Sequence, residues 1–101
     1  MPGSNSASLH FAIGDRSAAG HFPGNPIIPG AVLLREIVMA VADGAAVCRE
    51  IRSAKFHQPV RPGDTLIVSW TEKTGGEVRF SCTPAGSGQP AVTGTLRLAP
   101  A

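Results

Sequence analysis

The stretch HFPGNPIIPG, residues 21–30, leads directly into AVLLREIVMAVA, residues 31–42, and these two stretches decide the fold. The first contains three prolines and two glycines. It disfavours both helix and central strand, because proline lacks a backbone N–H and glycine lacks conformational restraint. We therefore expect a fixed, irregular loop with His21 at its mouth. The second stretch predicts a helix from about Gly30 to Asp43, and Gly44 suits a helix C-terminus.

The predicted helix is apolar nearly all round. Residues 31–42 include ten apolar side chains and two charged ones, Arg35 and Glu36, which are neighbours in the sequence. A helix of this kind belongs in a protein interior, so we expect the rest of the chain to wrap it. At 1.5 Å per residue it is roughly 20 Å long, which is too short to cross a bilayer core of about 30 Å.

Length and composition predict one globular domain, residues 1–101, with a loose start over residues 1–7. The formal charge is +2, and the chain has one Trp and no Tyr, so we expect neither nucleic acid nor a membrane as partner. Cys48 and Cys82 show neither a CxxC motif nor Cys/His ligand spacing. We expect two buried thiols, no metal and a cytoplasmic protein, because no targeting segment is evident.

The remaining segments favour strands. Apolar residues recur at strand spacing over residues 8–13, 45–56, 65–71, 77–83 and 92–98. Pro62-Gly63 and Gly75-Gly76 mark tight turns between them. Strands with one apolar face, joined by tight turns, predict an antiparallel sheet with one solvated side. The apolar side would hold the helix, which gives an α+β hotdog fold: a curved antiparallel sheet wrapped around one long central helix.

The sequence also resembles a known family. The pattern H-F-P-G-x-P-x-x-P-G over residues 21–30, followed by an apolar helix, resembles the signature of the FabA/FabZ-type 3-hydroxyacyl-acyl-carrier-protein dehydratases. K-F-x-x-P-V-x-P-G-D over residues 55–64 is similar to the strand and turn that follow the helix in that family. The resemblance covers roughly Leu9 to Leu98. It implies the hotdog fold, a hydro-lyase without a cofactor, and sheets paired edge to edge so that two subunits build each active site.

Dehydration of a 3-hydroxyacyl thioester requires three chemical roles. A base takes a proton from C2, an acid protonates the departing C3 hydroxyl, and a donor stabilises negative charge on the thioester oxygen. His21 is the candidate proton acceptor because imidazole titrates near neutral pH. The backbone N–H of Gly30 or Ala31 is the candidate oxyanion donor, because the first helical turn leaves such groups unpaired. Phe22 and Pro29, beside them in the loop, are candidate substrate contacts.

The third role is where the chain departs from the family. In the dehydratases a carboxylic acid on the central helix follows the loop histidine by fourteen positions, and here that position is Arg35. A guanidinium stays charged and cannot serve as the acid, so we assign Arg35 to substrate contact. Glu36 is the candidate replacement, although one residue turns a side chain by about 100° around a helix. Alternatively, the two residues form only a surface charge pair.

Three functions remain open at this point. The resemblance favours dehydration of acyl-carrier-protein or coenzyme A thioesters to trans-2-enoyl thioesters in fatty-acid or related lipid or polyketide synthesis. A thioesterase is a second candidate, because the hotdog fold hosts both activities. A catalytically silent subunit that pairs with an active dehydratase is a third, since the helix acid is missing. The expected assembly is a homodimer or a heterodimer with another hotdog protein, and the basic residues Arg49, Arg52, Lys55 and Arg61 either steer an acidic carrier or form a solvated strand face.

Overall fold

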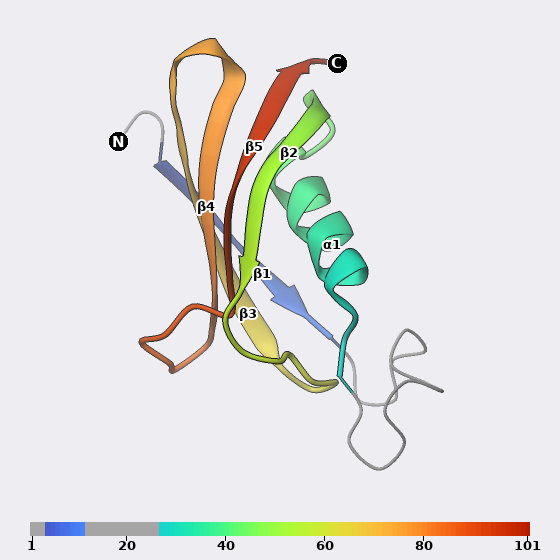
Figure 1. The fold of residues 1–101 in the computed structure, drawn as a ribbon, viewed down its shortest axis with the longest axis vertical. Coiled ribbons are helices and arrows are strands. Elements are labelled where there is room, and N and C mark those ends of the chain that lie inside the picture. Colours follow the sequence, from blue (N-terminus) through green and yellow to red (C-terminus); the bar gives the residue numbers. More distant parts are fainter. Residues whose placement is uncertain (1–3, 12–26) are drawn as a thin grey trace.

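The computed structural model describes residues 4–11 and 27–101, and it confirms the α+β hotdog architecture. One antiparallel sheet has the strand order β1-β3-β4-β5-β2, and α1 lies along one of its faces (Figure 1). The elements are β1 (Ser4–His10), α1 (Gly30–Ala42), β2 (Ala46–Phe56), β3 (Thr65–Glu72), the short 3-10 turn η2 (Thr74–Gly76), β4 (Glu77–Pro84) and β5 (Val92–Pro100). Strands β1 and β2 form the two edges of the sheet.

The helix α1 begins and ends near the predicted residues. Pro29 precedes it, and the carbonyl oxygen of Pro29 accepts hydrogen bonds from the N–H of Val32 at 3.0 Å and of Leu33 at 3.1 Å. At the other end Asp43 adopts the left-handed conformation and donates its N–H to the Met39 carbonyl at 2.9 Å. Within the part of the chain that the structure describes, no helix is long and apolar enough to cross a membrane.

The expectation that the rest of the chain wraps the helix is met along one side of α1 by the described residues. Only one stripe of α1 is buried, formed by Leu33, Ile37 and Val41, which recur every four residues and therefore share one face. On another face Met39 is 61% exposed. Val32, Leu34 and Val38 flank this stripe and pack partly buried against the core, so among the described residues the sheet covers one side of the helix.

The core lies between this helical stripe and the middle strands. The predicted alternation is confirmed in β3 and β4, where Leu66, Val68, Val78, Phe80 and Cys82 are buried at every second position, and in β5 Val92 and Leu96 are buried on the same pattern. The turns predicted at Pro62-Gly63 and at Gly75-Gly76 are also confirmed. The fully buried large side chains are Ile37, Val60, Leu66, Val68, Cys82, Val92 and Leu96.

The first strand starts earlier than expected. We predicted a loose start over residues 1–7 and a strand over residues 8–13, but β1 covers Ser4–His10 and pairs with β3 along its whole length. Residues Ser4–Ala7 are polar, but their backbone groups form hydrogen bonds with β3, and these bonds keep the segment in the sheet. The pattern of apolar side chains does not reveal such backbone bonds. Residues 12 and 13 lie outside the described residues.

Strand β2 differs from the other strands because its apolar side chains are exposed. Val47, Ile51 and Phe56 are 42%, 44% and 50% exposed. The register with β5 shifts between Cys48 and Glu50 and again between Ile51 and Ser53, so the strand carries two bulges. The expectation of two buried thiols is half right, because Cys82 is buried whereas Cys48, on this edge strand, is only half-buried.

Candidate functional site

The N-terminal turn of α1 presents backbone donors. Pro29 has no N–H, and no side chain of the described residues caps the helix. Among the described residues, the N–H groups of Gly30 and Ala31 have no hydrogen-bond acceptor. Both belong to the turn in which a helix presents partial positive charge, so an oxygen that gains negative charge is stabilised there. The sequence prediction of oxyanion donors at this place is therefore compatible with the geometry.

A hollow of about 410 Å³ opens beside this turn. The residues around it are mainly apolar and come from the segment before α1, from α1 itself and from the end of β2: Ile27, Ile28, Gly30, Leu33, Phe56, His57, Gln58, Pro59 and Val60. Val60 also holds the entry to the helix, because its carbonyl accepts the Ile28 N–H at 2.7 Å. The hollow is suited to an acyl chain next to the start of the helix.

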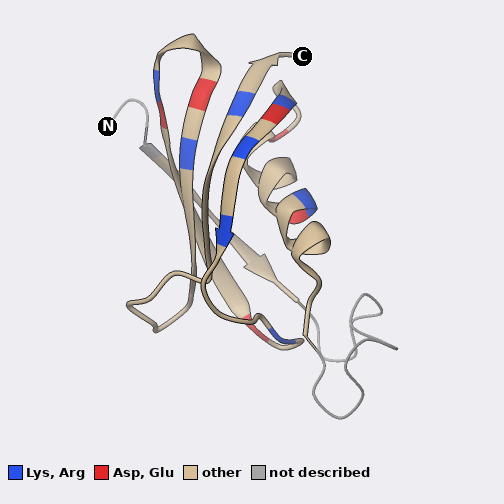
Figure 2. Cartoon of the chain, viewed as in Figure 1, with Lys and Arg blue, Asp and Glu red and all other residues tan. Residues whose placement is uncertain are grey.

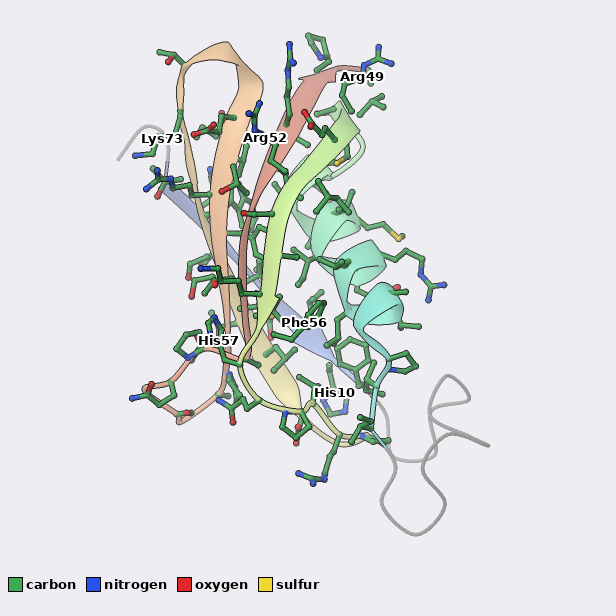
Figure 3. All side chains as sticks on the ribbon, in the orientation of Figure 1. His10, Arg49, Arg52, Phe56, His57 and Lys73 are labelled. Carbon is green, nitrogen blue, oxygen red and sulfur yellow. The ribbon has the colours of Figure 1, made fainter. Side chains whose placement is uncertain are left out.

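Phe56 is a site residue that the sequence reasoning missed. Its ring covers Gly30 so closely that a Cβ at residue 30 would lie 2.9 Å from the ring atom Cζ. Figure 3 shows Phe56 at the end of β2, level with the start of α1. Glycine at position 30 therefore lets the aromatic ring lie close to the helix and leaves room for an approaching thioester. The available signal was the K-F pair of the downstream motif, which we assigned to the sheet alone.

Arg35 and Glu36 form the adjacent charge pair that was one of the two expectations. Arg35 Nε donates to Glu36 Oε2 at 3.3 Å, and the two side chains are 64% and 35% exposed. Glu36 is the better enclosed of the two. It lies in a small hollow of about 190 Å³ between α1 and the end of β1, lined by Leu9, His10, Phe11, Val32, Arg35 and Glu36.

The structure does not bring all the predicted site residues together. Gly30, Ala31 and Pro29 lie at the start of α1. Glu36 follows Gly30 by six residues, which is about 9 Å along the helix axis at 1.5 Å per residue. The predicted catalytic His21 and the predicted substrate contact Phe22 lie outside the described residues. The donors and the candidate acid thus occupy different places on one chain.

The two described histidines, His10 and His57, are surface residues. Nε2 of His57 lies 2.8 Å from the Thr93 hydroxyl, and Nδ1 of His10 lies 2.8 Å from the Thr65 hydroxyl. His10 nevertheless lines the same small hollow as Glu36. His10 is therefore the described imidazole that shares a concave surface with the candidate acid.

Comparison with known proteins gives consistent results. Residues 3–95 match the family model ApeI-like, described as ApeI dehydratase. The 3-hydroxyacyl-[acyl-carrier-protein] dehydratase FabZ of Ehrlichia canis is 39% identical over 82 residues, covering 62% of this chain and 53% of the relative. FabZ of Wolbachia pipientis is 35% identical over 96 residues, covering 79% of this chain and 64% of the relative. The chain thus spans about half to two thirds of the length of these relatives.

Solved structures agree with the fold. The dehydratase heterocomplex ApeI:P from Xenorhabdus doucetiae includes a chain that superposes with a TM-score of 0.80 at 22% identity, covering 98% of this chain and 89% of that one. The (R)-hydratase from A. caviae superposes with a TM-score of 0.75 at 16% identity, covering 100% of this chain and 97% of that one. At these identities the likeness supports the hotdog fold alone.

Proposed function

The chain belongs to the ApeI-like dehydratase family, and on this premise we propose that it converts 3-hydroxyacyl thioesters to trans-2-enoyl thioesters. The observation that carries the proposal is the start of α1. The N–H groups of Gly30 and Ala31 have no acceptor among the described residues, and Gly30 lines a mainly apolar hollow of about 410 Å³. A thioester carbonyl at the donors with its acyl chain in the hollow is the substrate that this arrangement fits.

The proposed reaction needs no cofactor. His21 takes the proton from C2, and the negative charge that develops on the thioester oxygen is stabilised by the N–H groups of Gly30 and Ala31. Glu36 gives a proton to the C3 hydroxyl, which leaves as water while the C2–C3 double bond forms. Phe22, Pro29 and Arg35 contact the substrate around these groups, with Arg35 placed to bind a polar or anionic part of the carrier.

The proposed site is shared between two hotdog subunits. Glu36 lies about 9 Å along α1 from the donors of its own chain, so the carboxyl is better placed to serve a site whose donors come from another chain. The exposed apolar side chains on α1 and β2 support such pairing, because a soluble monomer rarely leaves them together. The structure from Xenorhabdus doucetiae is named as a heterocomplex. The partner subunit is therefore either a second copy of this chain or a different hotdog chain.

The experiment is a product analysis with 3-hydroxyacyl thioesters of acyl carrier protein and of coenzyme A. We expect absorbance from a conjugated enoyl thioester, and no free thiol. His21→Ala should lower the turnover number by on the order of 10² to 10⁴, because positioned acid–base groups contribute factors of that size. Its circular dichroism spectrum should match that of the parent. Release of free thiol without an enoyl product would instead identify a thioesterase.

A second candidate function is a silent subunit that supports an active dehydratase. It is favoured by one observation, the exposed ion pair of Arg35 with Glu36 at the helix position where the family carries its acid. In that case the chain alone would show no turnover, and addition of the active partner would restore it.

We also propose a cytoplasmic location. Both cysteines of the chain, Cys48 and Cys82, are free thiols. Free thiols are typical of a reducing compartment, where glutathione and thioredoxin oppose disulfide formation.

A further inference from the structure

A second hollow, of about 570 Å³, lies at the end of the sheet away from the start of α1. It opens where the turn before β4 meets the start of β2 and the end of β5, three segments that lie at the same end of the molecule in Figure 1. The residues that line it are Arg49, Gly75, Gly76, Arg97, Leu98, Ala99 and Pro100. None of them lines the hollow beside the start of α1, so the two hollows are separate.

A bulge in β2 brings two arginines to this hollow. Cys48 pairs with Leu98, whereas the next pair joins Glu50 to Arg97, so Arg49 is the extra residue. In a bulge, two successive residues of one strand oppose a single residue of its neighbour. Arg49 therefore lies beside Arg97, and Figure 2 shows blue bands on both strands near this end of the sheet.

The two guanidinium groups have no ion-pair partner in the part of the chain that the structure describes. No described carboxylate lies within 4.0 Å of Arg49 or Arg97. Glu50 and Glu77 oppose Arg97 on the neighbouring strands, but neither of them lines the hollow. The Glu50 carboxylate lies 3.9 Å from Arg52 instead. Two cations that share a concave surface repel each other, and an anion bound between them would relieve this repulsion.

The turn before β4 keeps the hollow open. Gly75 and Gly76 have positive φ angles, 74° and 82°, and carry no side chains that could fill the space. A Cβ at residue 76 would collide with the carbonyl oxygen of Leu98, so the turn packs closely on β5 at this residue. A Cβ at residue 75 would have no atom within 4 Å. The hollow therefore has room for a ligand on the side of Gly75.

We propose that Arg49 and Arg97 bind a phosphate group in this hollow, either a free phosphate ion or the phosphate of an ester. A guanidinium presents a planar fork of N–H donors that matches two phosphate oxygens. A phosphate has the oxygens and the negative charge for two such forks, whereas one fork satisfies the two oxygens of a carboxylate. Leu98, Ala99 and Pro100 line the remaining side of the hollow, where the organic part of an ester would lie. The inference does not depend on the proposed dehydratase activity, because it does not involve the start of α1.

The first test is a titration with sodium phosphate at constant ionic strength, followed by the NMR signals of the arginine Nε–H groups. We expect saturable shifts that Arg49→Gln/Arg97→Gln weakens at least about tenfold, since each exposed charge contact is worth up to about 1 kcal/mol. The matched control, Arg52→Gln/Arg79→Gln, removes the same charge elsewhere on β2 and β4. It should bind phosphate within about twofold of the parent, because distant exposed charges are screened. Shifts that do not saturate, equal weakening in both variants, or equal affinity for sodium acetate would overturn the proposal.

A pair of variants at Gly75 tests the place of the phosphate with both arginines present. Asp and Asn have nearly the same shape, both tolerate the left-handed conformation, and the space at residue 75 accepts either. Gly75→Asp should bind phosphate about three- to fivefold more weakly than Gly75→Asn, because its carboxylate repels an anion in the hollow. Equal affinity of these two variants would contradict the inference.

Coenzyme A and dephospho-coenzyme A distinguish the two sources of the phosphate, because only the first carries a phosphate monoester. Tighter binding of coenzyme A than of inorganic phosphate, lost both with dephospho-coenzyme A and in Arg49→Gln/Arg97→Gln, would assign the site to an ester. Equal affinity for coenzyme A and inorganic phosphate would assign it to the free ion. Binding of neither would overturn the proposal. These measurements report binding and not turnover, so their failure is distinct from a failure of the proposed dehydratase activity.

Discussion

At the scale of single residues, Gly30 both contacts the Phe56 ring and leaves space for the thioester, and substitutions can separate these two roles. Gly30→Ala places a methyl group 2.9 Å from the Phe56 ring and beside the N–H groups at the start of α1. Because alanine favours helix over glycine by up to about 1 kcal/mol, and the half-exposed ring can shift, we expect little change in the free energy of unfolding. Turnover should nevertheless fall at least about tenfold, since a displacement near 1 Å at a reacting group has effects of this size.

The double variant Gly30→Ala/Phe56→Leu is the control for that prediction. Leucine is smaller and removes the close ring contact, so recovery of turnover would assign the loss to the ring, and no recovery would assign it to obstruction of the thioester. Chemical denaturation of both variants reports stability. Full activity of Gly30→Ala would show that the start of α1 does not contact the substrate.

Cys82 predicts a loss of stability in alkaline solution. Burial raises the pKa of this thiol from 9.0 to about 11, because the charged thiolate is poorly solvated in the core. The unfolded chain therefore releases the thiol proton at a lower pH than the folded one does. Between pH 9 and 11 the unfolded state binds fewer protons, so the free energy of unfolding falls with pH by up to about 2–3 kcal/mol.

The comparison for this prediction is Cys82→Ala. This variant is less stable at neutral pH, because it leaves a cavity, but its free energy of unfolding should decline less steeply above pH 9. Urea denaturation at a series of pH values measures both slopes. Parallel slopes for the parent and the variant would show that Cys82 does not titrate as a buried thiol.

At the scale of elements, alternation predicted the middle of the sheet and failed at its edge. Leu66 and Val68 on β3 are fully buried, because a strand between two neighbours keeps a strict two-residue period. Strand β2 breaks that period at Arg49 and Arg52, and a bulge has no reliable signature in side-chain polarity. The exposure of Met39 on the helix could not be predicted either, since the hydrophobicity of a residue does not say which element covers it.

The end of α1 supplies a stability test that leaves the site untouched. Asp43 adopts a left-handed conformation with φ 46° and ψ 38°, and it places a carboxylate at the negative end of the helix. Asp43→Asn should raise the free energy of unfolding by about 0.3–1 kcal/mol at low ionic strength, because Asn tolerates this conformation and carries no charge. Urea denaturation at low salt and at 1 M salt measures the gain.

The salt dependence distinguishes the causes of that gain. The electrostatic part should nearly vanish at 1 M salt, where the screening length is about 3 Å. An undiminished gain would point to the backbone conformation, and a loss of stability would contradict both arguments. Turnover should stay at the level of the parent.

At the scale of the whole molecule, the fold was predictable from one chain and the site was not. The proline loop, the apolar helix and the tight turns identify the hotdog fold, and the described elements confirm it. The candidate site combines His21, the start of α1 and an acid that lies about 9 Å along the helix axis from the donors. The sequence of one chain does not say whether Glu36 approaches the Gly30 and Ala31 donors of its own subunit or those of the partner subunit. The role of Glu36 therefore stays a prediction.

The most direct test of the proposed chemistry is the turnover of 3-hydroxyacyl thioester by Glu36→Gln beside the parent, each studied with the partner that gives full activity. The account predicts a loss on the order of at least 10²-fold with an unchanged free energy of unfolding, because the amide keeps the shape of the carboxyl but cannot give the proton. Arg35→Glu should not raise the activity of the parent. Unchanged turnover of Glu36→Gln, or a gain on Arg35→Glu, would contradict the assignment of Glu36 as the acid.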